Sequence, residues 1–104
     1  MAHYLVRARP KRERLDELER ALRERELVGL RPFGPTLHRS LRDARVEADG
    51  AAVWEVEDYC SPPLAQERAA VLDRHFDGIE VEPVSPGEGW RRIEDLPRLF
   101  PQFV

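Results

Sequence analysis

The chain has 104 residues, 41% of them hydrophobic, and its 17 basic and 20 acidic residues give a formal net charge of −3 at pH 7. This length fits one small domain, residues 1–104, and the acidic balance argues against nucleic acid as a partner. A single cysteine, Cys60, excludes an internal disulfide and any multi-thiolate zinc or iron–sulfur site within one chain.

A membrane partner is not expected either. No apolar run approaches the ~18 residues needed to cross a bilayer, and residues 1–4 lack the basic and apolar regions of a secretory signal. We therefore expect a cytoplasmic protein. All but one of the basic residues are arginine, and asparagine is absent, which is compatible with a thermophilic source.

The first third of the chain predicts a strand, a helix and a loop. Residues 3–9 are β-prone and alternate in polarity, as a half-buried strand does. A helix is predicted from Pro10 to about Arg25, because three leucines recur there at helical spacing among charged residues. Residues 28–35 contain two glycines and two prolines, so they predict a loop.

The middle of the chain predicts a β-hairpin. Residues 36–46 are interpreted as a strand whose apolar positions shift parity, which indicates a bulge near residues 42–43. Asp49 and Gly50 form the turn, since this pair tolerates the positive φ angles of tight β-turns. Residues 52–58 alternate as the returning strand.

The last part of the chain predicts a helix, a strand and an apolar tail. Ser61 and Pro62 have the character of an N-cap and a first-turn proline, and the helix that they begin ends at Gly78. Residues 79–82 alternate as a final strand. The tail, about residues 85–104, is rich in large apolar side chains, and its prolines forbid a continuous helix. It is expected to pack on its own domain or on a partner subunit.

The order strand, helix, strand, strand, helix, strand predicts an α+β, ferredoxin-like βαββαβ domain. Its four-stranded antiparallel sheet carries both helices on one face, and its first strand lies between the third and the fourth. Trp54 is expected to be buried on the helical face. The open face would present His3, Leu5, Arg7, Val53, Glu55, Glu57, Glu80 and Glu82, with either His38, Ser40 and Arg42 or Leu37, Arg39 and Leu41.

Over residues 2–84, the element order and the alternation resemble the dimeric α/β-barrel superfamily. That superfamily includes muconolactone isomerases and small cofactor-free monooxygenases, and it joins two ferredoxin-like sheets face to face. The resemblance implies a fold, and it carries over no catalytic residue because folds host unrelated functions. In character the chain is similar to small bacterial proteins of this shape that have no assigned activity.

The open face of the predicted sheet holds the weak candidates for catalysis. Arg7 is expected across from Glu55 or Glu57, with His3 and His38 nearby. A histidine or glutamate there would act as a base on a small organic substrate, and Arg7 would stabilise an enolate. The alternative is that these charges form cross-strand ion pairs or line a dimer interface.

Cys60 and the histidines are weaker candidates for a functional site. A thiol at a helix N-terminus can be acidified, but Asp58 would raise the pKa of the Cys60 thiol, and a buried, inert cysteine is the alternative. Three histidines without HxH or HxxxH spacing predict no metal site, and no motif predicts a cofactor.

Two classes of function follow. The first is a structural or interaction module that forms a homodimer, because Leu5 and Val53 would otherwise face water, and burying each contributes ~1.5–3 kcal/mol. The alternative is a small cofactor-free enzyme, of isomerase or monooxygenase type, with a pocket for a small-molecule ligand on the open face. Against the dimer, the apolar tail from Ile93 to Val104 could fold back over this face within a monomer.

Overall fold

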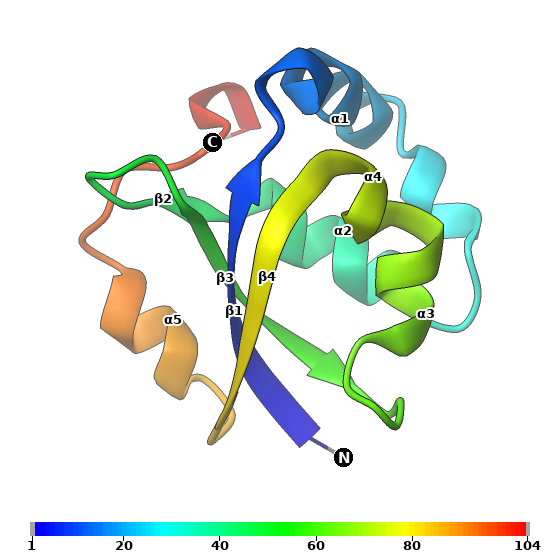
Figure 1. The fold of residues 1–104 in the computed structure, drawn as a ribbon, viewed down its shortest axis with the longest axis vertical. Helices are drawn as coiled ribbons and strands as arrows, with labels where there is room; N and C mark the ends of the chain where they lie inside the picture. Colours follow the sequence, from blue (N-terminus) through cyan, green and yellow to red (C-terminus); the bar gives the residue numbers. More distant parts are fainter. Residues whose placement is uncertain (1, 104) are drawn as a thin grey trace.

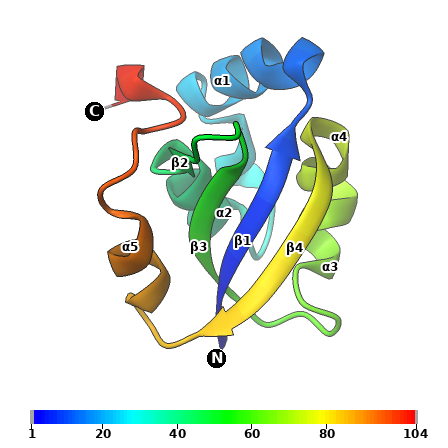
Figure 2. The same ribbon diagram turned by 60° about the vertical axis from the view of Figure 1, so that its left-hand side comes forward.

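The computed structural model describes residues 2–103, which fold as an α+β domain (Figure 1). Figure 2 shows the sheet in front of α1 to α4, with α5 set apart from them. The strands are β1 (Ala2–Pro10), β2 (Arg45–Val46), β3 (Ala52–Asp58) and β4 (Phe76–Val84), and the α-helices are α1 (Leu15–Arg23), α2 (Gly34–Arg42), α3 (Ala65–Glu67), α4 (Asp73–His75) and α5 (Glu88–Ile93). Shorter helical turns span Arg12–Arg14, Glu26–Gly29 and Pro101–Phe103, and a π-helical stretch, Arg68–Leu72, joins α3 to α4.

The sheet has the strand order β2-β3-β1-β4, and each neighbouring pair is antiparallel. The predicted position of the first strand between the third and fourth is therefore confirmed. The turn at Asp49 and Gly50 is confirmed as well, since it joins antiparallel β2 and β3. Gly50 has a φ of 92°, the conformation for which this turn needs a glycine.

The main core lies between the sheet and helices α1 to α4. Val6, Trp54 and Val56 project from the even positions of β1 and β3 into it, as the alternation of the sequence predicts. Trp54 has no exposed surface, which confirms its predicted burial, and its ring lies 5.1 Å from that of Phe76. Leu18 from α1 completes the contact between the helices and the strands.

The prediction of a bulged strand over residues 36–46 is wrong for most of its length. Gly34–Arg42 forms helix α2, and the strand is limited to Arg45–Val46. Leu37 and Leu41 are fully buried, so they do not lie on the open face. Their spacing of four residues fits one helix face as well as one strand face, and a proline in the first turn favours the helix.

The second predicted helix exists, but its ends differ from the prediction. It begins at Ala65 rather than at the Ser61 cap, because Asp58 accepts a hydrogen bond of 2.7 Å from the N–H of Leu64 and holds the preceding loop in place. The helical segment ends at His75 instead of Gly78. Phe76, which falls within the predicted helix, is instead the first residue of β4 and packs into the core.

The tail covers the face of the sheet that is opposite the main core. Ile93 of α5 packs against Leu5 and Val53, and the three side chains form a second buried cluster. Farther along, the N–H of Leu99 donates to the carbonyl of Ala44 at 2.8 Å, so the tail also follows the edge of β2. The tail therefore packs on its own domain over the described residues, and Val104 lies outside them.

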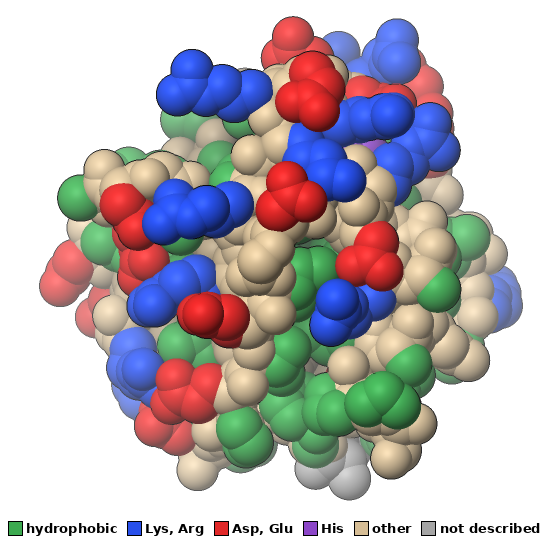
Figure 3. Space-filling view, viewed as in Figure 1, with side chains coloured by type: hydrophobic (Ala, Val, Ile, Leu, Met, Phe, Trp, Pro, Cys, Tyr) green, Lys and Arg blue, Asp and Glu red, His purple; other side chains and the backbone are tan. Residues whose placement is uncertain are grey.

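The surface mixes charges of both signs. Figure 3 shows acidic and basic side chains next to one another across one face of the molecule. Arg92 pairs with Glu82 at 2.7 Å, for example, and Arg9 pairs with Asp49 at 2.9 Å. Between residues 2 and 103, no helix is both long enough and apolar enough to cross a membrane.

Candidate functional site

Glu55 is buried beneath α5 and caps its N-terminus. Its carboxylate accepts hydrogen bonds from the backbone N–H groups of Gly87 at 2.9 Å and Trp90 at 3.1 Å, and its other neighbour is His3, at 3.1 Å. Burial alone would raise the pKa of Glu55, but these bonds outweigh burial and lower it. A β-carbon at position 89 would lie 2.9 Å from the carboxylate, so Gly89 permits this close approach. Glu55 thus fastens the tail to the sheet.

The other candidates on the open face are only partly brought together. His3 bridges the two glutamates, since its Nε2 lies 3.5 Å from the Glu57 carboxylate. The expectation that Arg7 faces one of these glutamates is wrong. Arg7 lies opposite Val53 in the register of the sheet, and its side chain pairs with Glu47 at 2.9 Å.

His38 is not part of this group, because the segment that carries it is a helix. It is buried on α2, and its Nδ1 has no hydrogen-bond partner within residues 2–103. Burial and the nearby charges of Arg25, Arg42 and Arg39 lower the pKa of His38. The expectation that His38 lies near the open face is therefore also wrong.

The outer edge of β3 is free over most of its length. β2 pairs only with Ala52 and Val53. The N–H and C=O groups of an antiparallel strand point alternately to its two sides, and the carbonyl of Ala51 points to β2, where it accepts from Glu47. By this alternation the backbone groups of Glu55 and Glu57 point to the same side, where β2 has already ended. Among residues 2–103, the backbone groups of Glu55 and Glu57 thus have no strand partner, and Glu57 is the more accessible of the two, since Glu55 is 4% exposed.

A groove runs along this edge, and we call it the edge groove. It consists of two adjoining cavities of about 210 and 310 Å³ that share Thr36 and Glu57. The smaller cavity reaches Trp90 of α5, and the larger reaches Tyr59, which is 71% exposed. One wall is formed by Phe33, Thr36, Arg39, Ser40 and Asp43, from α2 and the residues beside it, and the other wall by residues 55–58 of β3.

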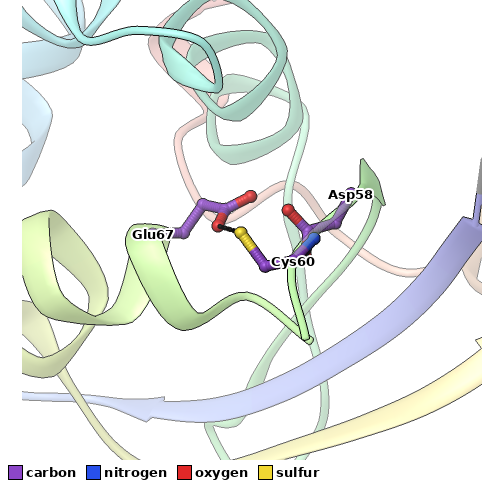
Figure 4. Close-up of side chains that lie close together, drawn as sticks. All are labelled: Asp58, Cys60 and Glu67. Atoms are coloured by element: carbon purple, nitrogen blue, oxygen red, sulfur yellow. Dashed lines mark hydrogen bonds between the residues drawn. The ribbon is translucent and has the colours of Figure 1, made fainter. Parts of the chain in front are cut away.

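A cluster of two carboxyl groups and a thiol lies at the Tyr59 end of the edge groove. Figure 4 shows Glu67 at the end of α3 and Asp58 at the end of β3, directed toward each other with Cys60 between them. The Cys60 thiol lies 3.8 Å from a Glu67 oxygen. Asp58 also accepts the N–H groups of Cys60 at 3.1 Å and Leu64 at 2.7 Å, so it closes the loop between β3 and α3.

The environment separates the proton affinities of the two carboxyl groups. Burial and the neighbouring Asp58 carboxylate raise the pKa of Glu67 to about 7. For Asp58, burial acts in the same direction, but the proximity of Glu67 and the hydrogen bonds from the N–H groups of Leu64 and Cys60 lower its pKa overall. Glu67 therefore holds a proton below about pH 7.

The thiol is not activated in this state. The backbone N–H of Gln66 lowers the pKa of Cys60, but burial and the negative charges of Asp58 and Glu67 outweigh it and raise the pKa. The sequence points to Cys60 and to the opposing charge of Asp58, but it gives no reason to single out Glu67. Glu67 is 1% exposed, and only the loop of Asp58 brings it to the thiol.

Comparison with protein-family models, with curated proteins and with solved structures found no match to this chain. The function is therefore inferred from two features of the chain itself. These are the edge groove along β3 and the cluster formed by Asp58, Cys60 and Glu67.

Proposed function

We propose that this protein is an interaction module with a ferredoxin-like arrangement, and that it binds an extended, basic segment of a partner protein in the edge groove. The observation that supports this most is the free edge of β3 at Glu55 and Glu57, facing a groove instead of another strand. An added strand gains main-chain hydrogen bonds from such an edge, and the groove contributes pockets for side chains.

The chemistry of the groove indicates which segment fits. Four acidic residues and Arg39 line it, the acidic ones being Asp43, Glu55, Glu57 and Asp58. The carboxylates of Glu55 and Asp58 are held by backbone N–H groups and that of Asp43 by Arg98, so Glu57 is the acidic group most available to a basic side chain. A strand added to β3 would alternate its side chains between the two faces of the sheet. A side chain beside Glu57 would be basic, and those on the α2 side would meet Phe33, Thr36 and Ser40 and would therefore be small.

Pairing of two copies through this edge is disfavoured. A twofold axis would place like acidic side chains of β3 near each other across the new ladder, and like charges directly opposite destabilise strand pairing.

The homodimer stays a prediction, and Leu5 and Val53, which motivated it, are covered by Ile93 of the same chain. Sedimentation equilibrium measures the oligomeric state directly. The cytoplasmic location and the thermophilic source stay predictions as well.

The alternative, a small cofactor-free enzyme with a small-molecule ligand on the open sheet face, has less support. α5 covers Leu5 and Val53 there, and one cavity on that face, beside Arg7 and Glu82, measures about 100 Å³. The candidates His3, Glu55 and Glu57 line the smaller cavity of the edge groove, but they are engaged with one another, and Glu55 also holds the start of α5. The edge groove is larger and more continuous. We therefore favour the interaction module.

A peptide and two proline variants test the proposal. The probe is a capped peptide in which lysine and valine alternate, so that its lysines lie beside Glu55 and Glu57. We expect its addition to shift the backbone amide resonances of these two residues in a heteronuclear NMR titration. Glu57→Pro is expected to weaken binding about tenfold or more, because it removes an edge donor and a carboxylate.

Controls separate the edge from other effects. Val56→Pro is expected to destabilise the fold by about 3 kcal/mol, since the N–H of residue 56 points to β1, whereas Glu57→Pro is expected to be tolerated at a free edge. Glu57→Gln removes the charge alone. The same peptide with N-methylated lysines loses the donors that face β3. Equal binding of both peptides, or unchanged binding to Glu57→Pro, would refute the proposal.

A further inference from the structure

Asp58, Cys60 and Glu67 together have the composition and spacing of a metal site. We propose that these three side chains bind one zinc ion at the Tyr59 end of the edge groove. The proposal is independent of peptide binding, because it concerns the loop between β3 and α3 rather than the free edge. Their ligand atoms lie within 4.8 Å of one another.

The geometry is close to that of a tetrahedral zinc centre. Zinc binds thiolate sulfur at about 2.3 Å and carboxylate oxygen at about 2.0–2.2 Å, so neighbouring sulfur and oxygen ligands are about 3.5 Å apart. The sulfur of Cys60 and the oxygen of Glu67 are 3.8 Å apart. Small side-chain rotations would bring both atoms within bonding distance of one ion.

A second observation points to a cation at this place. The Oε2 atom of Glu67 is buried and has no hydrogen-bond partner within residues 2–103, and the residue as a whole is 1% exposed. No lysine or arginine among residues 2–103 forms an ion pair with Glu67 or Asp58. Buried carboxylates are normally paired or coordinate a metal, and here a cation would satisfy both groups and the thiolate.

The ligand set selects among metals. Calcium and magnesium bind oxygen ligands, so the thiolate of Cys60 disfavours them, whereas copper(I) prefers several soft sulfur ligands. One sulfur with two carboxylates suits zinc. Three protein ligands leave a fourth position open, and both Asp58 and Cys60 line the cavity of about 310 Å³. An exchangeable water or a partner group would fill that position, as in zinc sites that are not purely structural.

Cobalt(II) provides the spectroscopic test, because cobalt bound to a thiolate has a charge-transfer absorption. The reduced, chelator-treated full chain is titrated with cobalt and then with zinc. We expect the absorption to saturate at one cobalt per chain and to disappear when zinc is added. Cys60→Ser is expected to abolish the absorption, and Glu67→Gln to weaken cobalt affinity about tenfold or more.

Controls make the outcome decisive. Glu80→Gln removes an exposed carboxylate of β4 outside the cluster and should leave cobalt affinity unchanged. Far-UV circular dichroism establishes that Glu67→Gln is folded, and Asp58→Asn provides a second ligand variant if it is not. The absence of a charge-transfer absorption would overturn the proposal. An absorption whose affinity is the same in wild type and Glu67→Gln would also overturn it, because the thiol would then be binding cobalt alone.

Discussion

Replacing Glu55 by alanine is expected to lower the free energy of unfolding by about 3 kcal/mol and to detach α5 from the sheet. The carboxylate is 4% exposed and accepts from the N–H groups of Gly87 and Trp90, so its removal leaves these donors without their partner. Hydrogen bonds to a charged group contribute about 1.5–3 kcal/mol each, and part of that is regained by hydration after detachment.

Urea denaturation measures the stability of this variant, and limited proteolysis at Arg91 and Arg92 reports whether α5 is released. Glu57→Ala is the matched control, because Glu57 lies on the same face of β3 and its contact with His3 is longer, at 3.5 Å. We expect it to change stability by less than about 1 kcal/mol. If Glu55→Ala behaves like Glu57→Ala, the tail is held by its apolar contacts alone.

In the metal-free protein, the contribution of Glu67 to stability is expected to fall as the pH rises from about 4.5 to about 7. The folded state raises the pKa of Glu67 from 4.5 to about 7, so between these values the folded chain binds more protons than the unfolded chain. The contribution of Glu67 is fully present below the unfolded pKa and is lost as the pH passes through the folded pKa. The loss is on the order of 3 kcal/mol.

Glu67→Gln isolates this effect. Glutamine has the shape of the protonated side chain and no titrating proton, so we expect the difference in stability between wild type and this variant to change by that amount over the same pH range. His38 and His75, whose pKa values are lowered by burial, titrate in both proteins and cancel in the difference. Asp58 and Glu55 do not obscure the comparison. Their lowered pKa values place their contributions at more acidic pH, where stability is lost as the pH falls. Parallel pH profiles for wild type and Glu67→Gln would contradict the assignment.

The sheet was predictable wherever one of its faces is uniformly apolar. Val6, Trp54 and Val56 lie on the helical face because alternation with a period of two has a single solution when that face packs on helices. The odd positions of β1 and β3 were harder to interpret. They mix Leu5 and Val53 with charged residues, and the sequence alone does not say that their cover is Ile93 of the same chain.

The failure at α2 has a local cause. Leu37 and Leu41 are four residues apart, a spacing that both a strand and a helix bring to one face. The parity shift that we explained by a bulge is instead the end of a helix at Arg42, followed by a strand of two residues. Because of this error, we predicted His38 near the open face and did not predict that the edge of β3 is free.

The candidate site was predictable only in part, because its parts come from distant segments. Sequence reasoning selected Glu55 for its position on the open face, but its capping role depends on where Gly87 and Trp90 fold. Glu67 gave no signal. The sequence does not distinguish a buried glutamate in a helix from an exposed one. The loop that Asp58 closes is what places Glu67 beside Cys60.

The central position of β1 has a consequence for how the chain folds. β1 pairs with β3 and β4, so His3 lies opposite Glu57 on one side and Val84 on the other. Both partners follow β1 by half the chain or more, and closing loops of this length is entropically costly before any contact compensates. We expect refolding on the millisecond-to-second timescale that is typical of folds with distant pairings. Until the last strand arrives, the first strand has an open edge and is the segment most exposed to aggregation.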